Sequence, residues 1–314
     1  MEEFEDNRNV YINIEENKEN KKEEIIQYVP LDLYEKDILP KNVLISTMTI
    51  TGYLGTSFNM DNIEKYMILD KEDIIAIKSA NSINKLPEYT LKSKSANKNS
   101  KKNFYNQLTT IVKINEEKYM NIKLFKNSSI QITGCKSLDD CNIGLNKIIK
   151  RLKEIYSYID EEGNFVDIKF VENIEDIKIS RMKIVMINSN FTINYCINRE
   201  ILYNILRNEH VNCRYNPSSH ACVNIKYKSS NDHKVSIFVF QTGKIIITGA
   251  KNLLHIKEAY NYIYTFLQKN KNKIIKKDIS KLLSNNDYLE IKNSIYNVTD
   301  NLGEKINEEL EMNE

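Results

Sequence analysis

Residues 240–251 read FQTGKIIITGAK, and this stretch decides the fold. Residues 125–136 read FKNSSIQITGCK, which is the same pattern 115 positions earlier in the chain. Six of the twelve positions are identical, and no gap separates the two copies. An ungapped match at this level predicts an internal repeat, and the fold has to be assigned with that repeat in view.

The elements on either side of the two copies match in kind. An amphipathic helix is predicted after each copy, because apolar residues recur at helical spacing over residues 145–159 and 256–267. A short strand is predicted before each copy, at residues 108–114 and 221–227. The repeated unit is therefore longer than the motif itself.

Each repeat opens with a further strand and helix. In the first repeat the strand is predicted at residues 42–50 and the helix at 59–69. In the second they are predicted at 183–195 and 197–208, with Asn198 as the helix cap. Hairpin-connected strands with helices on one side predict an α+β fold with an antiparallel sheet.

The chain outside the repeats differs in composition. We predict an acidic flexible tail over residues 1–30, the first repeat over 39–160, the second repeat over 178–270, and a helical acidic extension over 271–314. A stretch rich in Lys, Ser and Asn at residues 91–103 is predicted to be an exposed loop within the first repeat.

Charge is distributed unevenly along the chain. Residues 1–24 have a net charge of −5 and residues 301–314 a net charge of −4, which leaves +11 for residues 25–300. A basic body between acidic ends is typical of proteins that bind a polyanion. An ordinary lysine-rich surface with solvated tails is the competing interpretation.

Several classes of protein are disfavoured. The five cysteines form no CxxC pair, and the spacing of Cys213, His220 and Cys222 fits no standard zinc module, so we expect neither a metal site nor a disulfide framework. No signal peptide begins the chain, and no apolar run reaches the ~18 residues that a membrane helix needs. Catalytic motifs are absent, so we expect a soluble intracellular protein that is not an enzyme and binds no cofactor.

The repeated motif resembles that of the TATA-box-binding protein family. The second copy and the preceding YNPSSHACVNIKY, residues 215–227, are very similar to the family pattern. The first copy, together with NFYNQ at 103–107 and ISTMTITGYL at 45–54, resembles the divergent branch found in large double-stranded DNA viruses. The resemblance covers residues 39–270.

The resemblance implies a saddle of two pseudo-symmetric repeats. The concave face of its curved sheet would lie on the DNA minor groove, and the helices would cover the convex face. Apolar wedges at the two ends would unstack base steps and kink the duplex. Readout in the minor groove distinguishes mainly A·T from G·C pairs.

The family's wedging phenylalanines are partly retained. Phe125 and Phe240 align with the second member of each pair. Gln107 and His220 align with the first members and cannot wedge in the same way. For Phe125 and Phe240, placement in the hydrophobic core is the competing interpretation.

The family's two central asparagines are not retained, because Val43 and Met186 align with them. Asn188 and Asn190 lie two and four residues further along the same face and are the expected substitutes. The remaining expected DNA-binding residues are their counterparts in the first repeat, the threonines of the two copies, and three lysines for phosphates: Ile45, Thr47, Thr133, Thr248, Lys113, Lys226 and Lys244. The competing interpretation is that the threonines are ordinary strand residues and the lysines are solvated, with no role in DNA binding.

Two functions follow from the resemblance. The first is a transcription initiation factor that binds A/T-rich promoter DNA and nucleates a preinitiation complex with a transcription factor IIB-like protein and RNA polymerase. It would act in the nucleus or viral factory of an infected cell, with packaging in the virion possible, and the sequence leaves monomer or dimer open. The second is a protein-interaction scaffold with weak or no sequence-specific DNA binding. A basic rim around an apolar, threonine-bearing concave face would favour the first, and acidic rims would exclude it.

Overall fold

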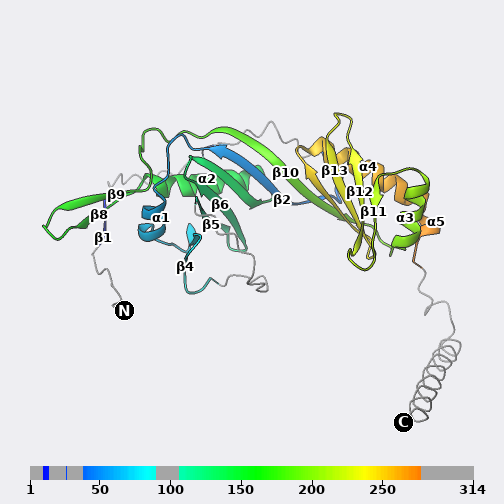
Figure 1. Cartoon of the computed structure of the whole chain (residues 1–314), viewed down its shortest axis with the longest axis horizontal. Helices are drawn as coiled ribbons and strands as arrows, with labels where there is room; N and C mark the ends of the chain where they lie inside the picture. The colour runs from blue at the N-terminus through cyan, green and yellow to red at the C-terminus, as the bar shows by residue number, and fades with distance from the viewer. Residues whose placement is uncertain (1–9, 14–25, 27–37, 90–105, 277–314) are drawn as a thin grey trace, which may run out of the picture.

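The computed structural model of the chain describes residues 10–13, 26, 38–89 and 106–276. Two sheets are present in this part, one of eleven strands and one of three (Figure 1). All strand pairings in both sheets are antiparallel. The predicted α+β fold with an antiparallel sheet is therefore confirmed.

The large sheet is built from the two repeats. The first repeat contains β2 (Leu44–Tyr53), α1 (Met60–Tyr66), β3 (Ile74–Lys78), β4 (Ile83–Lys85), β5 (Gln107–Asn115), β6 (Lys118–Phe125), β7 (Ser129–Cys135) and α2 (Leu138–Lys153). The second contains β10 (Ser180–Thr192), α3 (Arg199–Asn208), β11 (Cys213–Arg214), β12 (Cys222–Lys228), β13 (Lys234–Phe240), β14 (Lys244–Ala250) and α4 (Leu253–Lys269), followed by the short α5 (Lys271–Ile274).

The strand order shows how the repeats join. It runs β11-β12-β13-β14-β10-β2-β7-β6-β5-β3-β4, so the opening strands β10 and β2 pair at the centre and each repeat continues outward in the same order. Only β4 has no counterpart in the second repeat. The sheet is thus pseudo-symmetric about the β10–β2 pairing.

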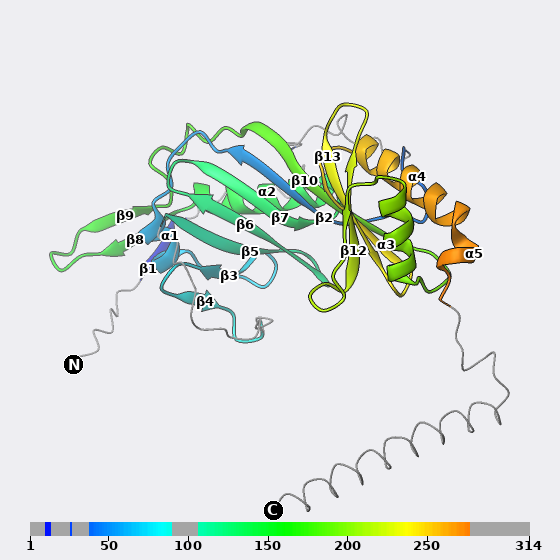
Figure 2. The same ribbon diagram turned by 45° about the vertical axis from the view of Figure 1, so that its right-hand side comes forward.

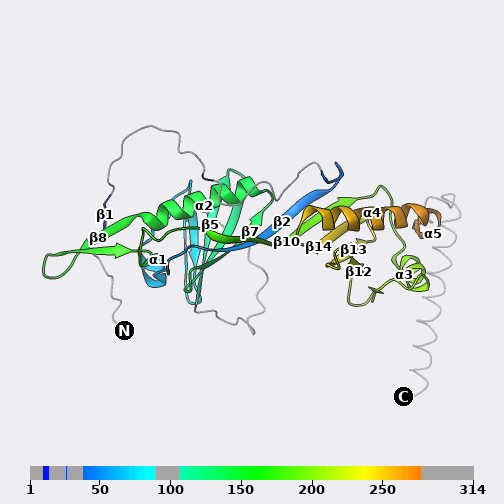
Figure 3. The ribbon, with the colours of Figure 1, turned by 90° about the horizontal axis from the view of Figure 1, so that it is seen from above.

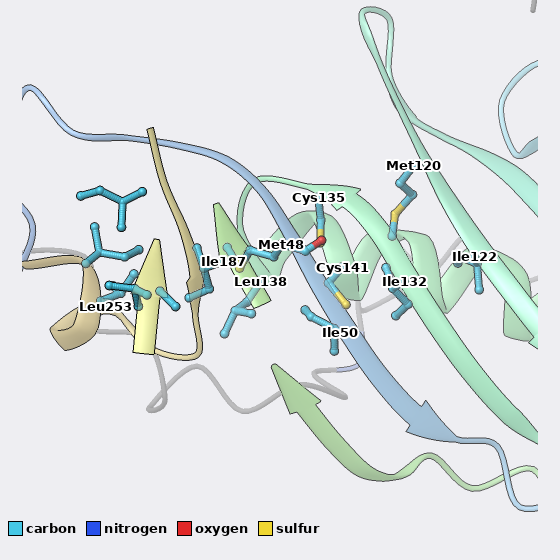
Figure 4. Close-up of a cluster of buried hydrophobic side chains, with 14 of the residues drawn as sticks. Met48, Ile50, Met120, Ile122, Ile132, Cys135, Leu138, Cys141, Ile187 and Leu253 are labelled. Atoms are coloured by element: carbon cyan, nitrogen blue, oxygen red, sulfur yellow. The ribbon is translucent and has the colours of Figure 1, made fainter. Parts of the chain in front are cut away.

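Strand register locates the pseudo-twofold axis. Met48 of β2 pairs with Cys135, and Ile187 of β10 pairs with Ala250, which is 115 positions after Cys135. Met48 and Ile187 are therefore equivalent, and they also pair with each other. Both are fully buried, and Figure 4 shows them side by side with Leu138 at the junction. The axis passes between these two residues.

The long helices α2 and α4 cover one face of the sheet (Figure 3). Their apolar residues pack on alternate strand residues such as Ile132 and Ile247, which are fully buried. Each such side chain contributes roughly 1.5–3 kcal/mol of hydrophobic stabilisation. We call the opposite face, which these helices leave uncovered, the open face.

Polar side chains cap the helices as the sequence suggests. The Asn198 side chain accepts from the backbone N–H of Ile201 at 3.1 Å, so the predicted cap of α3 is confirmed. Ser137 and Asp140 form a reciprocal capping box at the start of α2. These caps fix where each helix leaves the sheet.

The first repeat ends earlier than predicted. Helix α2 stops at Lys153, because Glu154 has extended backbone angles, and the apolar residues after it form β8 (Ile155–Ile159). β8 pairs with β9 (Phe165–Lys169) in a hairpin whose turn contains Gly163. The hairpin projects beyond the first repeat (Figures 1 and 2). The helix predicted to run to Ile159 is therefore wrong over residues 154–159.

The third strand of the small sheet is β1 (Val10–Asn13), which pairs with β8. These four residues fall within the predicted flexible tail, so the tail interpretation does not hold for them. The predicted loop at 91–103 lies outside the described residues, as does the predicted extension after residue 276. No helix in the described ranges is long and apolar enough to cross a membrane.

Candidate nucleic-acid interface

Eight strands contribute side chains to the open face. In β12, β13, β14, β10, β2, β7, β6 and β5, buried residues that pack under the helices alternate with residues on the open face. The open-face residues are those in phase with Lys226, Phe240, Thr248, Asn188, Thr49, Thr133, Phe125 and Thr109, except where a register shift in β2 or β10 changes the phase. Among them there is no Asp or Glu, whereas seven are lysines: Lys113, Lys123, Lys183, which pairs with Thr51, Lys226, Lys228, Lys234 and Lys244. This floor attracts anions rather than cations.

The two predicted threonines lie at equivalent positions of the open face. Thr133 of β7 pairs with Thr49 and with Asn121. Thr248 of β14 pairs with Ser236 and donates to Asn188 Oδ1 at 2.5 Å. Both are half-buried, so their hydroxyls sit in a polar row that crosses the sheet centre.

Each of these threonines is followed by a glycine, because the backbone at that next position has a positive φ and forms a bulge. Gly134 and Gly249 have φ values of +98° and +87°, in the left-handed region that favours glycine. The pairing of β7 with β2 and of β14 with β10 skips one residue at these glycines, so each forms a bulge within the strand. The bulge aims both threonines at the open face.

The register corrects the equivalences predicted for the opening strands. Asn188 and Asn190 correspond to Thr49 and Thr51, because Met48 corresponds to Ile187. The prediction that their counterparts are Ile45 and Thr47 is therefore wrong. Register shifts along β10 and β2 and the lack of shared residues concealed the true offset of 139.

The same correction changes the centre of the site. Thr47 lies on the open face opposite Asn188 and is the counterpart of Met186. Val43, the predicted counterpart of Met186, is buried in the core. Ile45 packs against the core on the helix side, so its predicted place among the DNA-facing residues is wrong.

Asn190 occupies the open face beyond Asn188. Its Nδ2 donates to Ser46 Oγ at 2.6 Å, which ties β10 to β2 near the sheet centre. The two asparagines are therefore both on the open face, as predicted, and each is held by a hydroxyl from a neighbouring strand.

Phe125 and Phe240 lie at equivalent positions near the ends of β6 and β13. Both are half-buried on the open face, and neither belongs to the hydrophobic core. Their cross-strand partners are Gln107 and Cys222. Gln107 therefore corresponds to Cys222, and the prediction that it corresponds to His220 is wrong.

His220 lies in the loop before β12 rather than on a strand. Its side chain is exposed, and its Nδ1 lies 2.8 Å from Ser219 Oγ. The residue 115 positions earlier is Tyr105, which lies outside the described residues. No group of three or more His, Cys, Asp or Glu residues that could hold a metal is present in the described part of the chain.

The three predicted lysines differ in their surroundings. Lys113 Nζ lies 3.0 Å from Glu72 Oε1 and 2.9 Å from Glu116 Oε1, and the side chain is only 9% exposed. Hydrogen bonds to Glu116 and Glu72 raise the pKa of Lys113. Because two carboxylates neutralise it, the prediction that Lys113 contacts phosphate is not supported by its surroundings.

Lys226 and Lys244 are exposed in the second repeat. Lys226 Nζ donates to Ser236 Oγ at 2.6 Å, which places the ammonium in the same row as Thr248. Lys244 begins β14 opposite Thr192. Both lysines are placed to meet an anion on the open face.

Comparisons with known proteins agree with this arrangement. The family model of transcription factor TFIID (or TATA-binding protein, TBP) matches residues 181–270, which is the second repeat. A TATA-box-binding protein-like protein of Acanthamoeba polyphaga mimivirus is 41% identical over 249 residues, which cover 74% of this chain and 67% of that protein. The chain belongs to the TATA-binding protein family.

More distant members also match. TATA-box-binding proteins 2 and 1 of Entamoeba histolytica are 26% identical over 157 residues, which is 50% of this chain and spans 61% and 55% of those proteins. The solved structure of Methanococcus jannaschii TBP covers 73% of this chain and 99% of its own, at 17% identity and a TM-score of 0.47. The family consists of transcription factors rather than enzymes, so the function of this chain is related to transcription.

Two basic residues outside the predicted set occupy equivalent positions in β3 and β11, toward the two ends of the large sheet. Lys78 of β3 pairs with Thr109, and Arg214 of β11 pairs with Asn224, which is the equivalent position. Arg214 is exposed, whereas Lys78 is half-buried and burial lowers its pKa. No sequence signal links them, because the segments that follow them differ in length.

Proposed function

We propose that the protein is a TATA-binding-protein-like transcription initiation factor whose open face binds the minor groove of A/T-rich promoter DNA. The observation that carries this proposal is the open face itself. It has no acidic residue on its eight central strands, two equivalent phenylalanines, and two equivalent threonines between them. The carboxylates nearest to it, those of Glu72, Glu116 and Asp232, lie outside these strands and are paired with Lys113 or Lys228.

The chemistry of these side chains fits a widened minor groove. Threonine hydroxyls and the amides of Asn188 and Asn190 can accept from or donate to base edges and sugars. A half-buried phenylalanine at each end can insert between base steps and unstack them. Lysines such as Lys226 and Lys244 add sequence-independent attraction to phosphates.

Binding of this kind suggests the protein's partners and place of action. We propose that the DNA-bound protein recruits a transcription factor IIB-like protein and RNA polymerase, in the nucleus or the viral factory of an infected cell. The relative named TATA-box-binding protein-like in mimivirus supports this setting.

The test is fluorescence anisotropy with two labelled duplexes of equal length, one A/T-rich with a TATA element and one G/C-rich, at low and moderate salt. The intact protein should prefer the TATA duplex. Phe125→Ala and Phe240→Ala should each weaken that binding by about tenfold or more, because each removes the burial of one aromatic ring. Phe165→Ala is the matched control, since Phe165 is 71% exposed on the β8–β9 hairpin and away from the open face.

The scaffold function is the second candidate, and one observation favours it. Met186 aligns with one of the family's central asparagines, and its counterpart on the open face is Thr47, so neither of these two central positions has an asparagine. If both duplexes bind equally weakly and all binding disappears at moderate salt, only phosphate attraction remains and the scaffold function is preferred.

A further inference from the structure

The two ends of the open face differ because of one insertion. In the second repeat, residues 215–221 connect the equivalents Arg214 and Cys222. In the first repeat, the corresponding connection between Lys78 and Gln107 comprises residues 79–106. Its described part, residues 79–89, adds β4 to the edge of the sheet, and the pairing with β3 continues past β4, where Leu86 N–H donates to Ile75 O at 3.0 Å.

This segment covers the outer part of the open face in the first repeat. Leu86 and Tyr89 pack on Ile75, Ala76 and Ile111, which are 4%, 0% and 2% exposed. These residues form a small apolar cluster separate from the main core under the helices. Leu86 and Tyr89, which belong to the insertion, cover this cluster on the open face.

Further contacts hold the cover in place. The Tyr89 ring meets the ring of Tyr119 edge to face, with 5.5 Å between centroids. Lys71 Nζ lies 3.2 Å from Glu88 Oε1, and Lys85 Nζ donates to Tyr89 O at 3.0 Å. Tyr119 lies on the open face of β6, so the cover reaches across β3 and β5.

The equivalent surface of the second repeat is open and basic. Lys226 corresponds to the covered Ile111, and Lys234 corresponds to Tyr119. Lys228 corresponds to Lys113 but is 57% exposed and has one carboxylate neighbour, Asp232, at 2.8 Å. Where the second repeat offers three exposed lysines, the first offers an apolar cluster and one neutralised lysine.

We propose that duplex DNA occupies the open face from the sheet centre to the end of the second repeat, and that residues 79–89 keep it off the outer end of the first repeat. This inference rests on the proposed function and adds a polarity to it. The second repeat holds the phosphates, and the first contributes β2, β7 and the end of β6 that carries Phe125. The DNA is therefore bound in one direction and over a shortened stretch.

Equivalent substitutions at the two ends test this polarity. Arg214→Ala should weaken duplex binding and make the dependence of log affinity on log salt shallower by about one unit, the change expected for one lost phosphate contact. Lys78→Ala removes the equivalent charge and should leave both affinity and salt dependence unchanged. Equal effects of the two substitutions would overturn the proposal. Circular dichroism and cooperative thermal unfolding confirm that each variant is folded.

Removing the cover provides the second test. In the Leu86→Ser/Tyr89→Ser variant, hydroxyl-radical footprinting should show protection extended on one side of the site, and adding Lys78→Ala should then weaken binding. An unchanged footprint would contradict the role of residues 79–89. If the unmodified protein binds the A/T-rich and G/C-rich duplexes equally, that result counts against the proposed function. It does not affect the comparison of Arg214→Ala with Lys78→Ala, which can be made with any duplex that binds.

Discussion

The starts of helices α2 and α4 meet the same structural demand with different chemistry. The backbone N–H of Lys136 donates to the Asp140 carboxylate at 2.9 Å. At the equivalent place in the second repeat, the N–H of Lys251 donates to Nδ1 of His255 at 3.3 Å. The backbone requires an acceptor at this point, and a carboxylate and an imidazole both provide one.

The residue that contacts each acceptor also differs between the repeats, in a way that suits the acceptor's chemistry. Asp140 is ion-paired with Lys118, whereas His255 stacks on His233, the equivalent of Lys118, with 4.4 Å between ring centroids. The two repeats therefore keep the positions that shape the backbone and exchange the charges around them. The open face follows the same rule, because its bulges are shared, whereas of its lysines Lys113 and Lys228 alone occupy equivalent positions.

The largest difference in the free energy of unfolding is expected when the residues at one pair of equivalent open-face positions, Ile111 and Lys226, are each replaced by the other repeat's residue. Ile111→Lys would place a charge in the apolar cluster beneath Leu86 and Tyr89, and should lower the free energy of unfolding by about 3 kcal/mol or more. Lys226→Ile at the exposed equivalent position should change it by less than about 1 kcal/mol. Urea unfolding measures both, and similar effects would show that the first repeat is not covered.

The turns between the last two strands of each repeat give the next contrast. Gly243 has φ +82°, and a Cβ there would lie 2.6 Å from the carbonyl oxygens of Ile193 and Tyr195. Gly243→Ala should therefore cost about 2 kcal/mol of unfolding free energy. Ser128, its equivalent, already adopts φ +62°, so Ser128→Gly should change stability by less than about 1 kcal/mol. Thermal and urea unfolding of both variants measure these changes. If Gly243→Ala leaves the free energy of unfolding unchanged, the steric explanation for Gly243 is wrong.

A smaller contrast is expected at the threonines. Thr248→Val removes a hydrogen bond to Asn188 and leaves that amide oxygen half-buried, at a cost of about 1 kcal/mol. Thr133→Val, at the position opposite Thr49, should cost less, because Thr49 has a methyl group to pack against the new side chain. If the two variants unfold at the same urea concentration, the Thr248–Asn188 bond contributes nothing to stability.

Much of the fold could be predicted because the motif at 125–136 and 240–251 repeats without a gap. That identity fixed the equivalence of β7 with β14 and of α2 with α4. The identity did not extend to β2 and β10. The inward-facing positions of these strands need only be apolar to pack beneath the helices, so different apolar residues occupy them in the two repeats. There the offset followed only from the register around Met48 and Ile187.

Other features of the site were not accessible from the sequence. The apolar run after residue 153 fits a helix and a strand equally well, and its pairing with β9 decides in favour of β8. The sequence around Lys113 is that of a surface lysine, and only the fold brings Glu72, 41 residues earlier, beside it. The cover formed by Leu86 and Tyr89 depends on packing between segments that no local pattern connects.

The smallest expected effect is a pH dependence confined to the second repeat. Burial lowers the pKa of His255, as do the neighbouring His233 and Lys251, while Glu258 opposes them. The folded state therefore binds its proton more weakly than the unfolded state, whose pKa is about 6.5. The stability that depends on neutral His255 is complete above pH 6.5 and is lost as the pH falls toward the lowered pKa.

Asp140 responds at a lower pH. Burial acts to raise its pKa, but hydrogen bonds from Lys118 and from the N–H groups of Lys136 and Ser137 outweigh burial and lower it. Its contribution is complete above an unfolded pKa of about 3.9 and is lost below that. Urea unfolding between about pH 5 and 6.5 should therefore show a slope that His255→Gln reduces and Asp140→Asn leaves unchanged. A slope that survives in His255→Gln would show that His255 is not the group that causes it.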